Sequence, residues 1–333
     1  MSVSELESLR RSYEADRYLG PVKTCLDNLI EYGKDRYGRI HSPIWMAVID
    51  VDSLEAPRNP KPCDEAVRVQ RRGRRAPGGS NLYMDQPMIR AALKLSDRTG
   101  DEKYARAVAE YATYYLRHFL DPQTGLIEWG WHNYYDAYED AIEYLEGHHH
   151  EIHIFMPVWP ALYRCAPDVI EREIAQIWEW HVDHETGQFG RHPDRGLGCS
   201  FAMTGGEFVL AFAFMHSVTK DPKYLAYARK VANRHWEARH RESNLIPNQV
   251  EREEYRFDCV TCDTSISGLW CSRLLAASVL AGAPDLLDMA CRVLVAFSNY
   301  GWNDDNRHHG LLNLDGSPVP GPRATEGDEQ WAP

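Results

Sequence analysis

The sequence has no stretch of about 18 consecutive apolar residues, the length that a membrane-spanning helix requires. Its first residues, MSVSELESLRRSYEADRY, are charged and contain no apolar segment of the secretory type. We therefore expect a chain with no membrane partner and a cytoplasmic location.

A cysteine pattern typical of a disulfide framework is also missing. The eight Cys residues are dispersed along the chain, and only Cys259 and Cys262 form a CxxC pair. A single CxxC without a second pair is weak evidence for zinc or redox chemistry. The pattern favours reduced thiols that pack in the interior.

Positive charge is in deficit, since the formal net charge is −12 at pH 7. Binding to phosphate backbones requires Lys and Arg, so nucleic acid is not an expected partner. One local exception is RVQRRGRRAPGG, which ends an Arg-rich run at Arg75. We interpret residues 55–80 as an inserted loop, either solvated or contacting an anionic ligand through its guanidinium groups.

Apolar residues at intervals of three and four dominate the chain and predict an all-α protein. Strand patterns are hardly visible. The periodic segments are CLDNLIEYGKDRYG, MIRAALKLSDRTG, DEKYARAVAEYATYYLRHFL, VIEREIAQIWEWHVD, EFVLAFAFMHSVT, PKYLAYARKVANRHWEAR, GLWCSRLLAASVLAG and LLDMACRVLVAFSNY.

An internal repeat predicts how these helices are arranged. Residues 97–127 align with residues 217–246, each with a capping Asp, a Lys-Tyr pair, a long helix and a closing turn. Turns with short extended segments recur at Gly38, Gly125, Gly187, Asn244 and Gly310. The intervals between these turns suit αα-hairpins, which bury their apolar faces only against neighbouring hairpins. We predict a single domain over residues 1–333, an (α/α) toroid that is complete or lacks a last hairpin.

In a ring of this kind the turns gather at one end. The residues that the turns would bring there are His41, Trp129, Trp131, His132, Arg191, His192, Asn248, His308 and His309. A rim rich in His, Arg and Trp is typical of a binding cleft.

The residues with the clearest chemistry lie in the middle of the chain. His132 is followed by the run His148 to His150, by Glu151 and His153, and then by Arg191 and His192. Two imidazoles and one carboxylate from separate hairpins could bind a divalent ion with positions open for substrate. The stretch HEIH is one residue shorter than the HExxH of metalloproteases, which excludes that reading. A solvated His run is the simpler alternative.

Residues 126–193, with WHNYYD, the His-Glu cluster and GRH in this order, resemble family 2 of the polysaccharide lyases. This family of pectate lyases is built on an (α/α) toroid. The resemblance implies a divalent ion bound by His132, Glu151 and His192. Mn²⁺ is the expected ion, with Mg²⁺, Co²⁺ or Ni²⁺ as alternatives, and Arg191 is the implied catalytic residue. His150 or His153 could replace or join Glu151 as the middle ligand.

The implied activity is β-elimination from uronate-containing glycans such as pectate and oligogalacturonides. Removal of the C5 proton places enolate-like charge beside the substrate carboxylate, and a cation there stabilises that charge. A guanidinium has a pKa above about 12, so Arg is an unusual base. Pairing of Arg191 with the substrate carboxylate is the milder alternative.

Aromatic residues flank the first expected ligand and could stack on sugar rings. These are Trp129, Trp131 and Tyr135, for which core packing is the equal alternative. Asn81, in the Gly-rich segment GGSNLYMDQP, and Arg75 are further candidates for substrate contacts.

Other functions fit the same fold. A glycoside hydrolase would need two carboxylates around the scissile bond, and no pair is singled out by spacing. A sugar epimerase would use His residues as acid and base without a metal. A non-catalytic carbohydrate- or protein-binding toroid would make no use of the His cluster. The sequence does not fix an oligomeric state.

Overall fold

The computed structural model describes residues 15–58, 76, 78–144, 148–198, 200–251, 258–303 and 306–319. The chain divides into two compact units, the first made of Met1–His118 with Tyr134–Glu143 and the second of Phe119–Asn133 with Tyr144–Pro333. Most of the Arg-rich insertion, including Arg75, lies outside the described residues. The single domain over residues 1–333 stays a prediction.

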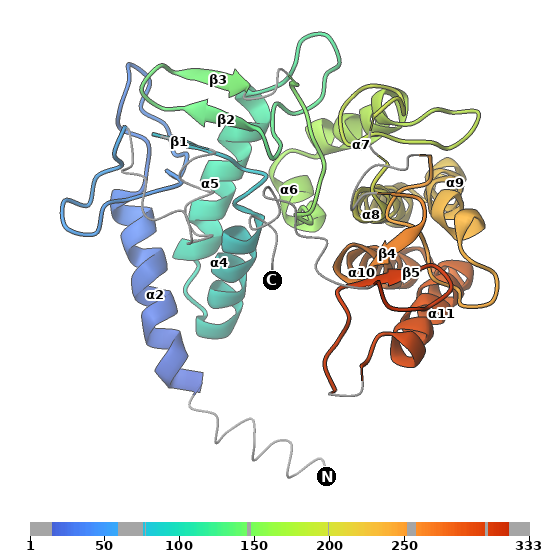
Figure 1. Ribbon diagram of the computed structural model, residues 1–333. Helices are drawn as coiled ribbons and strands as arrows, with labels where there is room; N and C mark the ends of the chain where they lie inside the picture. The colour runs from blue at the N-terminus through green and yellow to red at the C-terminus, as the bar shows by residue number, and fades with distance from the viewer. Residues whose placement is uncertain are drawn as a thin grey trace. The chain divides into compact units, whose positions relative to one another are not determined.

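Among the described residues of the first unit, helix α5 packs against both α2 and α4 (Figure 1). A short sheet with strand order β1-β2-β3 lies in the same unit, where Ser80 pairs with Tyr135 in the antiparallel register. The elements are α2 (Ala15–Tyr32), β1 (Gly79–Ser80), α4 (Gln86–Thr99), α5 (Lys103–His118), β2 (Asn133–Asp136) and β3 (Ala141–Tyr144). The hairpin of β2 and β3 was not predicted.

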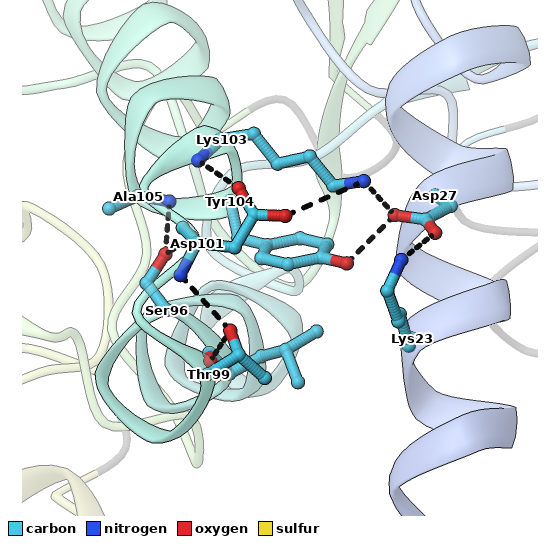
Figure 2. A network of polar contacts seen from close by, with 9 residues as sticks. Lys23, Asp27, Ser96, Thr99, Asp101, Lys103, Tyr104 and Ala105 are labelled. Carbon is cyan, nitrogen blue, oxygen red and sulfur yellow. Dashed lines mark hydrogen bonds and ion pairs between the residues drawn. The ribbon is translucent and has the colours of Figure 1, made fainter.

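A polar cluster fixes α2 against α5 (Figure 2). The Asp27 carboxylate on α2 lies 2.7 Å from Nζ of Lys103 and accepts a 2.8 Å hydrogen bond from the hydroxyl of Tyr104. Lys23, one turn earlier on α2, lies 2.7 Å from its other oxygen. Hydrogen bonds from Lys103 and Lys23 hold the pKa of Asp27 well below its usual range.

The described residues of the second unit form helical hairpins of α6 with α7, α8 with α9, and α10 with α11 (Figure 1). Helices α8 and α10 pack extensively on each other, which joins the last two hairpins. The elements are α6 (Trp159–Cys165), α7 (Pro167–His181), α8 (Ala202–Thr219), α9 (Pro222–Ala238), β4 (Thr261–Asp263), α10 (Thr264–Ala281), α11 (Pro284–Tyr300) and β5 (Leu311–Asn313). Each of the eight periodic segments thus contains helical residues, and among the described helices α6 was not predicted.

Close approach of α8 and α10 depends on a glycine. A Cβ added at Gly206 would lie 3.0 Å from Cα of Trp270 and 3.2 Å from Cβ of Arg273, both on α10. By length and composition, α10 is the one helix among the described residues that could cross a membrane. It packs against α8 and α11, and 39% of its residues are buried.

The predicted turns recur with the same hydrogen bonds in the second unit. The amide of Gly125 donates to the carbonyl of Asp121 (2.8 Å), that of Gly187 to Asp183 (2.8 Å), and that of Asn244 to His240 (2.9 Å). All three turn residues have positive φ, +74°, +75° and +64°. Gly adopts this conformation readily and Asn tolerates it, which explains their recurrence. The structure therefore confirms the repeated turn at these three of the five predicted positions.

The 97–127 and 217–246 repeat is confirmed at the helix starts. Oδ1 of Asp101 accepts from the amide of Lys103 (3.1 Å), and Oδ1 of Asp221 accepts from that of Lys223 (3.0 Å). Satisfying the first helical amides in this way is what N-capping residues do.

Cys262 of the CxxC pair behaves as a packing thiol. It is a free thiol and is buried beside the hydroxyl of Ser267. Burial raises the pKa of Cys262 to about 12, which is unsuited to thiolate chemistry.

His235 on α9 makes stability depend on pH. Its ring is fully buried, and burial lowers its pKa to about 3. Below a pH of about 6.5 the unfolded chain binds a proton that the folded chain does not, so stability falls as the pH decreases from there. We expect His235→Phe to flatten the dependence of the unfolding free energy on pH by about 1.4 kcal/mol per pH unit between about pH 6 and pH 4, measured by urea denaturation. Equal slopes in both proteins would contradict this assignment.

Candidate active site

Three segments of the second unit lie side by side and carry the expected site residues. The amide of Glu151 donates to the carbonyl of Trp129 (2.9 Å), and the amide of Ile152 donates to that of Arg191 (3.1 Å). A Cβ added at Gly130 would lie 2.6 Å from Cβ of Glu151. Only glycine allows this approach, so the backbone itself brings residues 129–132, 150–152 and 190–192 together.

The Glu151 carboxylate is the centre of the cluster. Its side chain is only 1% exposed. Oε2 lies 2.9 Å from Nδ1 of His132 and accepts a 3.0 Å hydrogen bond from the amide of Trp131, while Oε1 lies 3.2 Å from a guanidinium nitrogen of Arg191. A buried charge needs such partners. Burial alone would raise the pKa of Glu151, but the hydrogen bond with His132 and the charges of His153 and Arg191 lower it to about 2.

His192 is held in a neutral state beside this carboxylate. Its ring is buried and stacks on that of His148, with centroids 3.8 Å apart. Burial, partly offset by the charge of Glu151, lowers the pKa of His192 to about 4. Among the described residues, its buried Nδ1 has no hydrogen-bond partner. A neutral imidazole nitrogen without a partner is what a metal ligand requires.

Aromatic rings form one wall of the cluster. Trp131 stacks on His153 and on Phe155, with centroids 5.7 Å and 5.4 Å away. Phe201 contacts His153 edge-on and lies 5.8 Å from the guanidinium carbon of Arg191. His153 therefore has a packing role beside Glu151.

The other described residues expected to contact substrate make different interactions. Trp129 is fully buried and packs on Trp159, which is the core-packing alternative. Tyr135 and Asn81 belong to the first unit, where Tyr135 donates to Asp140 (3.2 Å) and Asn81 accepts from the amide of Met84 (3.2 Å). Their contacts with substrate stay a prediction.

The expected rim is assembled in part. Trp129, Trp131, His132, Arg191 and His192 come together as the preceding contacts describe. The remaining members are placed as follows: His41 in the first unit, Asn248 accepting from the amide of Ala202, His308 against Phe297 and Trp302, and His309 donating to the carbonyl of Gly301.

A second group of possible ligands was not predicted from the sequence. Single ligand atoms of Asp121, Glu128 and His149 all lie within 4.8 Å of one another. Nδ1 of His149 is 3.8 Å from Asp121 and 3.6 Å from Glu128, and its side chain is half exposed. Asp121 follows α5 and Glu128 follows the Gly125 turn, so only the folded turn unites them.

Comparison with known proteins supports the expected resemblance. Residues 62–199 match the sequence model of a family described as periplasmic pectate lyase. The chain is also 26% identical over 197 residues to pectate disaccharide-lyase of Dickeya dadantii (strain 3937), a match that covers 58% of this chain and 34% of that protein. The chain thus spans about a third of the length of this curated relative. The resemblance to the pectate lyase family is confirmed, over a longer segment than residues 126–193.

Similar solved structures show the fold. Cellobiose 2-epimerase from Spirochaeta thermophila DSM 6192 has a TM-score of 0.57 at 17% identity and covers 94% of this chain and 76% of that chain. A D-mannose isomerase has a TM-score of 0.55 at 12% identity and covers 92% and 77%, respectively. The predicted all-α, (α/α)-toroid fold class is confirmed. A cytoplasmic location stays a prediction, since the description of the matching family names the periplasm.

The cluster generates a prediction for metal binding. We expect His132→Ala and His192→Ala each to weaken Mn²⁺ binding by at least about 100-fold in isothermal titration calorimetry, because even changes outside the ligand set cost about 10- to 100-fold. His184→Ala serves as the matched control, because this imidazole is half exposed and stacks on Trp178. Unchanged affinity in both ligand variants, with their folding retained, would refute the ligand assignment.

Proposed function

We propose that this protein is a metal-dependent lyase that cleaves uronate-containing glycans, such as pectate and oligogalacturonides, by β-elimination. The single observation that carries the proposal is the buried Glu151 carboxylate, which His132 and Arg191 contact from separate segments. The match of residues 62–199 to pectate lyases supports a lyase acting on polysaccharides.

The residues around Glu151 suit a divalent transition ion. Two imidazoles and one carboxylate, from His132, His192 and Glu151, form a donor set that such ions accept. Nδ1 of His132 and Oε2 of Glu151 are 2.9 Å apart. These two side chains would hold the ion together with His192, in place of the hydrogen bond between them. The unpartnered Nδ1 of His192 supports the same assignment.

The reaction separates into a proton transfer and a bond cleavage. A base removes the C5 proton of the uronate, and the electron pair of the former C5–H bond forms the C4=C5 double bond. The C4–O bond breaks, and the leaving oxygen takes a proton. A divalent cation bound here would supply positive charge beside the substrate carboxylate and so stabilise the developing negative charge.

Arg191 is the residue suited to act on the substrate. Its side chain is 21% exposed, so the guanidinium reaches solvent while it pairs with Glu151. Contact with Phe201 holds the side chain on its other side. In its neutral form Arg191 would accept the C5 proton, the role that the family resemblance implies. As a guanidinium it has no free lone pair, and it would instead bind the uronate carboxylate in a bidentate pair. Both roles require it to face the substrate.

A test with polygalacturonate separates the proposed reaction from its alternatives. With Mn²⁺ we expect ultraviolet absorbance from the unsaturated product, and EDTA should abolish it. Reducing ends without absorbance would instead indicate a hydrolase, and an epimerase would change neither signal. A polymer left intact under all conditions, together with unchanged oligogalacturonides, would contradict any lyase or hydrolase.

Variants of Arg191 provide the control for this assay. Arg191→Ala and Arg191→Lys should each lower kcat by at least about 100-fold, because positioned proton transfer contributes about 10²- to 10⁴-fold. Arg195→Ala is matched to them, since Arg195 lies in the same turn but is exposed and packs on Trp180. Full activity in Arg191→Ala would remove this residue from the mechanism.

A further inference from the structure

A chain of fully buried polar side chains lies behind the Glu151 cluster and has no role in the proposed mechanism. His150, Glu173 and His181 are each 0% exposed. Glu173 and His181 lie on α7, and His150 directly precedes Glu151. Buried polar groups of this kind are stable only when hydrogen bonds satisfy them.

At one end of this row of buried side chains, the hydrogen bonds determine which nitrogens of His181 and His150 carry protons. Nδ1 of His181 lies 3.0 Å from the carbonyl oxygen of Gly190, so this nitrogen carries the proton and donates. Burial lowers the pKa of His181 well below its usual range, so the ring is neutral and Nε2 is an acceptor. Nδ1 of His150, 2.8 Å from that Nε2, must therefore carry a proton as well.

The other end reaches the segment that bears His132. Nε2 of His150 lies 2.8 Å from Oε1 of Glu173 and 2.9 Å from Nε1 of Trp129. Oε2 of Glu173 accepts a 2.8 Å hydrogen bond from the amide of Ile127. These hydrogen bonds thus link α7 to residues 127–129, to residue 150 and to residue 190.

The residues held in this way lie just before expected site residues in the sequence. His150 is followed by Glu151, Gly190 by Arg191, and Trp129 by His132 three residues later. We propose that Glu173, His150 and His181 are positioning residues, which hold these segments in register against α7 so that Glu151 meets His132 and Arg191. The inference deepens the proposed function, on which its metal readout rests.

The wild-type protein gives the first test, which needs no metal and no variant. In the ¹⁵N-histidine-labelled protein, NMR should show slowly exchanging Nδ1 protons on His181 and His150. A proton on Nε2 of His181, or rapid exchange at both rings, would overturn the proposal.

Two variants of Glu173 form a matched pair for the second test. In Glu173→Gln the amide oxygen still accepts from the amide of Ile127, while the amide nitrogen shares the acceptor position at Nε2 of His150 with Nε1 of Trp129. Glu173→Ala removes both contacts. In the metal-free protein we expect the Gln variant to retain the NMR signal of the Nδ1 proton that His132 donates to Glu151. In a separate titration it should bind Mn²⁺ like the wild type. The Ala variant should lose that signal and bind Mn²⁺ about 10- to 100-fold more weakly.

The outcomes separate the two proposals. Failure of the wild type to bind Mn²⁺ would refute the metal in the proposed function, while the His132 signal in the two variants would still decide the positioning role. An unchanged His132 signal in Glu173→Ala, or its loss in Glu173→Gln, would overturn that role. Should Glu173→Ala fail to fold, the Gln variant and the wild-type tautomers decide the matter.

Discussion

Burial of the Glu151 carboxylate is the constraint on which the rest of the site depends. A carboxylate that loses its water must be paired and hydrogen-bonded, or it takes up a proton. Here the amide of Trp131, the ring of His132 and the guanidinium of Arg191 replace that water. Because the partners come from segments far apart in sequence, the charge of one side chain holds three loops together.

The helical hairpins make this pairing possible because they fix the positions at which the loops begin and end. The turns at Gly125 and Gly187 use the same hydrogen-bond pattern, and each leads within a few residues to a member of the cluster. Gly130 then allows the backbone of its loop to approach Glu151. Repetition of one turn thus supplies the geometry, and glycine supplies the close contact.

Periodicity predicted most of the fold because long amphipathic helices leave a strong signal. Helix α6 has seven residues, too few to show a period, and was missed. The β2–β3 hairpin was missed because its aromatic residues, such as Tyr135, are equally consistent with packing at a turn. Strong local signals therefore sufficed for helices and not for short elements.

The site was predictable where the residues are adjacent or match a known pattern. His132, Glu151, Arg191 and His192 were expected together. His132 and Arg191 contact Glu151, and His192 directly follows Arg191. The role of Glu173 had no sequence signal, because it lies within an ordinary amphipathic helix and acts only through the folded chain. The group of Asp121, Glu128 and His149 likewise depends on a turn that unites distant positions.

Anomalous diffraction from crystals soaked in Mn²⁺ tests the central claim most directly. The account predicts one strong anomalous peak bounded by His132, Glu151 and His192, with Arg191 beside it. A peak at Asp121, Glu128 and His149 with none at Glu151 would contradict it, because the buried carboxylate would then serve only to hold the loops together.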